Sequence, residues 1–136
     1  QDLKNGITIY QCTATLDLST SAQDVAGLTT GSFTPGVSET ALVILIILFR
    51  QDQGTNPCNA GDILRAALFV DTTQETLLTT TLASGGAGSA LGIQFYKVSL
   101  TAAAHTIKAQ AWNATGARGR VGSASHMIVW RMQNFT

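Results

Sequence analysis

The sequence predicts an all-β protein, a jelly-roll β-sandwich of about eight antiparallel strands. Short segments rich in β-branched and aromatic residues recur at fairly regular spacing along the 136 residues, and turn-forming glycine and proline separate them. No segment shows the period of a long amphipathic helix. Residues 41–49 are apolar without interruption, which is typical of a strand that is covered on both faces.

The N-terminal half supplies the first expected strands. Residues 1–6 are polar and are predicted to form an N-terminal arm, with a single domain over 7–136. Residues 7–18 alternate loosely between polar and apolar positions, which predicts a strand. A short strand at 28–33 precedes the turn at Pro35-Gly36, and the apolar run 41–49 follows it. The chain opens on Gln1 without an initiator methionine, which is expected of a processed or trimmed product.

The C-terminal half continues the pattern. Residues 62–70 suit a short helix or a strand, and strand is favoured because strands are expected on both sides. Threonine-rich residues 72–82 favour extended backbone, since β-branching disfavours helix. Glycine-rich connections are expected at 84–89 and 115–122. The remaining expected strands are 93–100, 105–112 and 126–132.

The run 41–49 is apolar at both parities, that is, at its odd-numbered and its even-numbered positions alike. Alternate side chains of a strand point to opposite faces. One face would carry Leu42, Ile44, Ile46 and Leu48, and the other Val43, Leu45, Ile47 and Phe49. A membrane-spanning helix needs about 20 apolar residues, and this run ends at Arg50, so no membrane span is expected. These eight residues are therefore predicted to lie in the core or at an oligomer interface, covered by another layer of the chain or by a second copy.

Composition narrows the classes of partner. Only 12% of the residues are charged and the formal net charge is zero, so no basic surface for nucleic acid is expected. Low charge with 45% hydrophobic residues predicts a protein that buries much of its surface or works as an assembly. Cys12 and Cys58 leave two alternatives open, one disulfide or two separate buried thiols.

Little in the sequence points to catalysis. His105 and His126 lack the His, Cys and carboxylate spacing of a metal site. No Gly-x-Ser-x-Gly elbow is present and the carboxylates are scattered. No catalytic residue, cofactor or metal is therefore expected, and the protein is not expected to be an enzyme. Asn113-Ala-Thr115 and Asn134-Phe-Thr136 match the glycosylation acceptor pattern.

Aromatic side chains suggest carbohydrate binding as one alternative function, because their flat faces stack on sugar rings. Trp130 is flanked by Ile128 and Val129 and is predicted to lie in the core. Trp112 adjoins a polar loop and is the better candidate for a glycan contact.

Three segments of the C-terminal half are similar in sequence to segments of known proteins. Asp62-Ile-Leu-Arg-Ala-Ala-Leu-Phe-Val-Asp71 leads from a polar turn into a strand, residues 98–111 contain His105-Thr-Ile-Lys-Ala-Gln110, and residues 125–132 form a closing strand. Together they resemble small jelly-roll proteins, similar to tumour necrosis factor, that occur in bacteriophage virions and on bacterial surfaces. Two departures are Ala104, where glycine usually precedes the His-Thr pair, and Thr72, where a turn glycine is common.

The resemblance implies a homotrimer with a structural role in a virion or extracellular assembly, as head decoration, fibre or tail component. Its partners would be its own copies and other virion or surface proteins, and the arm 1–6 could dock the trimer onto a scaffold. Two alternatives stay open: a carbohydrate-binding or adhesion module that contacts a host glycan, and a subunit of an extracellular filament in which neighbours share strands. A hydrolase on this scaffold would need a pair of carboxylates facing one cleft.

Overall fold

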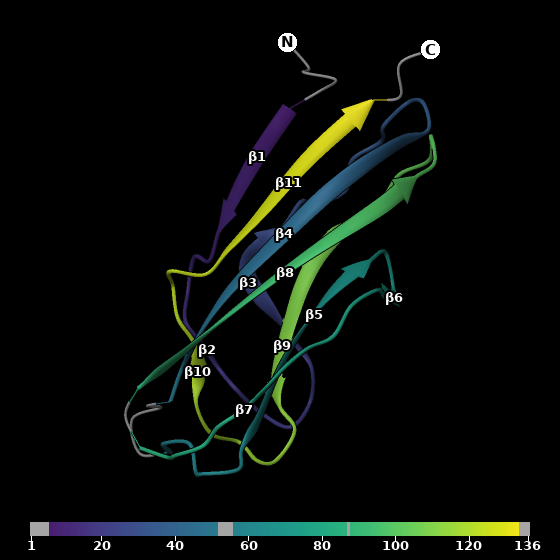
Figure 1. The fold of residues 1–136 in the computed structure, drawn as a ribbon. Coiled ribbons are helices and arrows are strands. Elements are labelled where there is room, and N and C mark those ends of the chain that lie inside the picture. Colours follow the sequence, from purple (N-terminus) through teal and green to yellow (C-terminus); the bar gives the residue numbers. More distant parts are fainter. Residues whose placement is uncertain (1–5, 52–55, 87, 134–136) are drawn as a thin grey trace.

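The computed structural model describes residues 6–51, 56–86 and 88–133. Within these ranges the regular structure is entirely β, and two antiparallel sheets pack face to face (Figure 1). This arrangement confirms the predicted jelly-roll class. The described residues form eleven strands rather than about eight, because three two-residue strands extend the edges of the longer ones.

The first sheet, called sheet A, is built around the apolar run. Its main strands lie in the order β1 (Gly6–Gln11), β11 (His126–Gln133), β4 (Glu39–Arg50) and β8 (Ser89–Leu100). Beyond the end of β11, the short strands β10 (Arg120–Val121) and β2 (Leu16–Asp17) continue the sheet beside β4. Strand β4 is therefore central, with β8 on one edge and both β11 and β10 on the other.

The second sheet, called sheet B, lies behind sheet A in Figure 1. It has the order β3 (Gln23–Thr29), β9 (Ile107–Asn113) and β5 (Ile63–Val70). The far edge of β5 pairs with two short strands in turn, β7 (Leu78–Thr81) and β6 (Thr73–Gln74). The segment that the sequence left open between helix and strand is thus the centre of a sheet.

Two expected strands and one expected connection differ in the structure. The segment 7–18 is interrupted after Gln11, because Cys12 and Thr13 donate backbone hydrogen bonds to Ser125 and to Ala26 in place of a continuous ladder. The strand expected at 28–33 is β3, which ends at Thr29, and Phe33 forms only an isolated bridge to His105. The connection expected at 115–122 contains the strand β10.

The core fills the space between the sheets with alternate residues of the long strands. Sheet A contributes five side chains of β4 that are at most 1% exposed: Ala41, Val43, Leu45, Ile47 and Phe49. Opposite them, sheet B contributes Leu64, Ala66, Leu68, Ile107, Ala109 and Ala111. Each large apolar side chain that becomes fully buried stabilises the fold by about 1.5–3 kcal/mol.

The loop between β8 and β9 accommodates Ala104 at the position where the proteins that the chain resembles usually have glycine. Asp71 is the one non-glycine residue in the described ranges with a positive φ, at 58°. Ala104 therefore has a negative φ, which alanine adopts without strain. The arm predicted at 1–6 lies outside the described residues, except that Gly6 begins β1. No helix long and apolar enough to cross a membrane occurs among the described residues.

Candidate functional site

The two faces of β4 have different surroundings. Its odd-numbered residues from Ala41 to Phe49 are buried in the core, whereas the four even-numbered apolar residues point outward and are only partly buried. These four are Leu42, Ile44, Ile46 and Leu48. No other layer of the described chain covers them. The eight predicted residues thus divide by parity, four between the sheets and four on the outer face of sheet A.

The neighbouring strands place further apolar side chains beside these four. Residues directly opposite one another in adjacent antiparallel strands share a face. One row across the sheet is therefore Ile7, Trp130, Leu42 and Lys97, and the next is Ile9, Ile128, Ile44 and Phe95. A third row is Gln11, His126, Ile46 and Ile93, and a fourth pairs Leu48 with Leu91. We call this surface the A face.

The A face is extensively exposed. Phe95 is 66% exposed, Ile9 63% and Trp130 42%, and Ile7, Leu91 and Ile93 also expose more than half of their surface. Isolated apolar side chains are common on protein surfaces, whereas a large contiguous apolar patch is rare on a monomeric soluble protein. The four strands lie side by side in one sheet (Figure 1), and no pocket interrupts the surface of the described residues.

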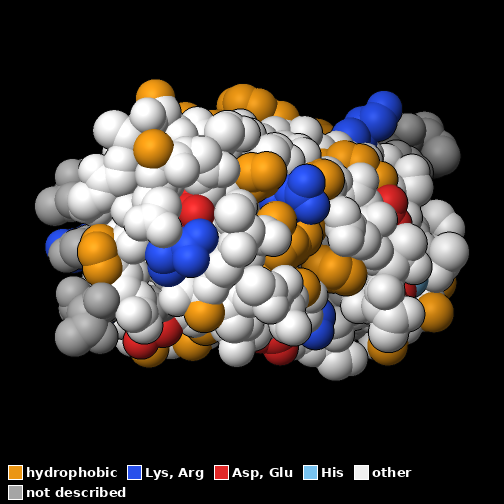
Figure 2. Space-filling model, turned by 90° about the horizontal axis from the view of Figure 1, so that it is seen from below, with side chains coloured by type: hydrophobic (Ala, Val, Ile, Leu, Met, Phe, Trp, Pro, Cys, Tyr) orange, Lys and Arg blue, Asp and Glu red, His pale blue; other side chains and the backbone are white. Residues whose placement is uncertain are grey.

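Polar side chains on the A face lie mainly at its margins. Lys97 ends the first row on the edge strand β8. Gln11 and His126 lie on the third row, and His126 Nδ1 is 2.7 Å from the carbonyl oxygen of Ala124. No carboxylate lies on these rows, so the surface has little charge to repel a second copy. Viewed from one end in Figure 2, charged side chains of both signs are scattered rather than gathered into one patch.

The prediction for Trp130 is wrong. Ile128 and Trp130 do share a face, but it is the outer one, and Val129 between them points into the core at 2% exposure. Trp112 also lies on an outer face, that of sheet B, where it is half-buried opposite Arg65. The structure therefore leaves a tryptophan on each side of the sandwich.

The two cysteines are separate buried thiols and do not form a disulfide, which is the second of the two alternatives that the sequence left open. Cys12 and Cys58 are free thiols and both are buried. Cys12 Sγ donates a hydrogen bond to the carbonyl oxygen of Ala14 at 3.0 Å. Burial raises the pKa of both thiols above the ordinary value, so neither has the lowered pKa of a reactive cysteine.

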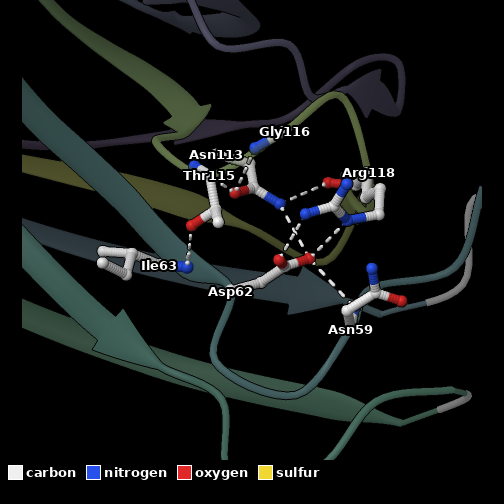
Figure 3. A network of polar contacts seen from close by, with 7 residues as sticks. All are labelled: Asn59, Asp62, Ile63, Asn113, Thr115, Gly116 and Arg118. Carbon is white, nitrogen blue, oxygen red and sulfur yellow. Dashed lines mark hydrogen bonds and ion pairs between the residues drawn. The ribbon is translucent and has the colours of Figure 1, made fainter.

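A polar network closes one end of the sandwich (Figure 3). Asp62 lies just before β5 with no exposed surface, and Arg118 binds both of its oxygens at 2.9 and 2.6 Å. The backbone N–H of Asn59 donates to the same carboxylate at 2.9 Å. The bond from Arg118 is the main reason why the pKa of Asp62 falls from 3.8 to about 2.

Asn113, the first predicted glycosylation acceptor, belongs to this network. Its side chain is fully buried and its amide nitrogen donates to Asp62 and to the carbonyl oxygen of Arg118. Its amide oxygen accepts bonds from the backbone N–H groups of Thr115 and Gly116. All of this amide's polar atoms are thus used inside the fold (Figure 3). The second acceptor, Asn134, lies outside the described residues.

The two histidines lie apart. His105 Nδ1 is 2.9 Å from Asp71 and Nε2 is 3.0 Å from the hydroxyl of Thr101. The bond to His105 is the largest cause of a lowered pKa at Asp71. His126 lies on the A face. Among the residues that the structure describes, no group of three or more His, Cys, Asp or Glu side chains could hold a metal ion, and no cavity was found.

Sequence reasoning found the four β4 residues of the A face and missed the rest. The missed apolar residues are Ile7, Ile9, Leu91, Ile93, Phe95, Ile128 and Trp130. Their strands do alternate, but alternation alone does not show which parity faces the core. The signal was available in β4, since a strand apolar at both parities implies that its neighbours share an apolar outer face.

The sequence matches no protein family and no curated protein. Among solved structures, the chain is similar to Eiger TNF from S. frugiperda, with 12% identity and a TM-score of 0.59 over 98% of this chain and 96% of that one. A family 35 carbohydrate binding module from an environmental isolate has 14% identity and a TM-score of 0.45, over 94% and 99% of the two chains. A structure of infectious bursal disease virus, Gx strain, has 9% identity and a TM-score of 0.40, over 96% of this chain and 33% of that one. At these identities, the similarity to Eiger TNF supports the jelly-roll fold alone.

Proposed function

We propose that this protein is a non-enzymatic structural subunit that assembles as a homotrimer through its A face, within a virion or extracellular assembly. The observation that carries the proposal is the apolar outer face of four adjacent strands, β1, β11, β4 and β8. In a strand with one face in water, the residues on that face are normally polar and alternate with apolar residues on the buried face. Here both parities of β4 are apolar, and β8 carries Leu91, Ile93 and Phe95 outward.

A second copy is the occupant that fits this surface best. The rows of the A face carry one lysine and no carboxylate, so the face offers no charge pattern for a strongly charged partner. In a closed threefold assembly the A faces of the three copies would converge on the symmetry axis, where each would cover apolar surface of its neighbours. The number three is supported by the resemblance of residues 98–111 to jelly-roll proteins that form trimers.

Burial of the A face would offset the free-energy cost of association. Six apolar side chains of the A face expose more than two fifths of their surface, and burying the remainder contributes about 1 kcal/mol each. Each association step costs about 4–15 kcal/mol, because the partners lose translational and rotational freedom. A trimer buries this surface on each of three copies, about 18 kcal/mol in all, which is of the same order as the cost of its two association steps. The interface would carry its energy at the aromatic anchors Phe95 and Trp130.

In an assembly of this kind the protein acts mechanically. The A face would hold the copies together, while the outer face of sheet B and the loops at the two ends stay free for a capsid, a tail protein or a host surface. The resemblance to bacteriophage and bacterial surface proteins supports this role. The strand-sharing filament is less well supported, because β1 pairs along its whole length with β11 of its own chain.

The proposal is tested by placing one charge on the A face. Phe95→Asp puts a carboxylate on β8 where the interface would exclude water, and is expected to convert the trimer to a monomer with an unchanged far-ultraviolet circular dichroism spectrum. Thr79→Asp is the matched control, since Thr79 is exposed on the outer face of sheet B. Sedimentation velocity should show a trimer for the control. A Phe95→Asp variant that sediments like the wild type would refute the proposed interface.

A further inference from the structure

We propose that the outer face of sheet B binds an acidic saccharide, with Trp112 stacking on a sugar ring and Arg65 holding the sugar's carboxylate. This inference does not depend on the trimer. The two surfaces lie on opposite sides of the sandwich, so assembly through the A face leaves Trp112 and Arg65 accessible.

The strand register brings the two residues together. Arg65 on β5 lies directly opposite Trp112 on β9, and Thr79 on β7 lies opposite Arg65 on its other side. Alternate residues of β5 and β9, including Leu64, Ala66 and Ala111, are buried in the core, so Arg65 and Trp112 point outward. An aromatic ring, a guanidinium and a hydroxyl therefore form one row across three strands.

Among the described residues Arg65 has no acidic partner, whereas Lys108 on the same face pairs with Asp24. Its Nε atom is buried and forms no hydrogen bond, and no ion pair involves its side chain among the described residues. The other cation on this face, Lys108, is 3.1 Å from Asp24, which also accepts a bond from Gln110 at 2.7 Å. A buried N–H without an acceptor is unfavourable, and an oxygen atom of a bound ligand would supply one.

The chemistry of the row fits a carboxylate on a sugar. A guanidinium binds a planar carboxylate through two parallel hydrogen bonds. The half-buried Trp112 offers an apolar ring flank of the kind that stacks on pyranose faces. The exposed hydroxyl of Thr79 is available for a sugar hydroxyl. The surface is a sheet face without a cavity in the described part of the chain, which suits an extended glycan rather than an enclosed small ligand.

The experiment compares acidic and neutral saccharides by isothermal titration calorimetry. The probes are tri-galacturonate against its methyl ester, and 3′-sialyllactose against lactose. We expect at least one acidic probe to bind ten times or more tightly than its neutral partner, with weaker binding at higher salt. Arg65→Gln should abolish that preference, and Trp112→Ala should abolish binding of both members of the pair. Lys97→Gln, which removes a cation on the A face, should leave both affinities unchanged.

The inference would be overturned by no binding of any acidic probe at millimolar concentration, by equal affinity for both members of each pair, or by an unchanged preference in Arg65→Gln. A short peptide that binds through its terminal carboxylate while the saccharides do not would also overturn it. If a variant fails to fold, the wild type decides the matter, because the indole N–H resonance of Trp112 should shift on titration with the acidic probe. A trimer that does not bind saccharides would leave the proposed function intact.

Discussion

At the scale of single residues, the buried carboxylate of Asp62 is the centre of a polar network. Arg118 and the backbone N–H of Asn59 hold it between β5 and the loop before β10, and Asn113 adds a third contact (Figure 3). Breaking a buried pair leaves an uncompensated charge. The network therefore stabilises the fold chiefly by tying loops that are distant in sequence to one end of the sandwich.

Asp62→Asn is expected to lower the free energy of unfolding by about 3 kcal/mol at neutral pH, the low end for breaking a buried pair, because Arg118 keeps some contact with water. The folded pKa of Asp62 is lowered, from 3.8 to about 2. Its contribution is therefore complete above pH 4 and is lost as the pH falls toward 2. The difference between wild type and variant should shrink by about 2 kcal/mol across that window, as measured by urea unfolding at each pH.

The matched control for this prediction is Asp17→Asn. The Asp17 side chain is 67% exposed and lies 3.5 Å from Arg120, and exposed pairs of this kind contribute at most about 1 kcal/mol. An Asp62→Asn variant that behaves like the Asp17→Asn variant at every pH would mean that the network does not hold the carboxylate as described.

At the scale of elements, β4 has two different faces, and two adjacent residues on it have opposite surroundings. Ile47 has no exposed surface and lies between the sheets, whereas Ile46 lies on the A face opposite His126 and Ile93. The same substitution at the two positions therefore separates folding from assembly.

Ile47→Asp buries a charge in the core, and is expected to destabilise the fold by more than about 4 kcal/mol and to yield insoluble or unfolded protein. Ile46→Asp should give a soluble monomer with a cooperative thermal transition. Circular dichroism and size-exclusion chromatography distinguish the two results. If both variants are soluble and oligomeric, or both unfold, the division of β4 into a core face and an assembly face is wrong.

The sequence predicted the elements better than their surroundings. The apolar run 41–49 indicated both faces of β4, since no one-sided strand needs apolar residues at both parities. It did not show that Trp130 points outward, because the parity of β11 follows from its pairing with β4. The ion pair between Asp62 and Arg118 joins residues 56 positions apart, and no local pattern marks such a contact. Strand breaks such as the one after Gln11 also depend on backbone partners from distant segments.

At the scale of the whole molecule, the two outer faces of the sandwich differ in chemistry. The A face is a broad apolar surface with few polar groups, whereas the outer face of sheet B mixes Trp112 and Arg65 with the ion pair of Lys108 and Asp24. This asymmetry suits a subunit that holds its own copies on one side and presents a ligand-binding surface on the other. The trimer would thus expose three copies of the sheet B face to the surroundings.

The native mass of the wild-type protein in solution tests this account most directly. Light scattering coupled to size-exclusion chromatography at micromolar concentration should give a mass near three times 14.2 kDa. The A face would then be buried between copies. A single species of 14.2 kDa that stays monomeric as the concentration is raised would contradict the central claim, because the A face would then remain in water.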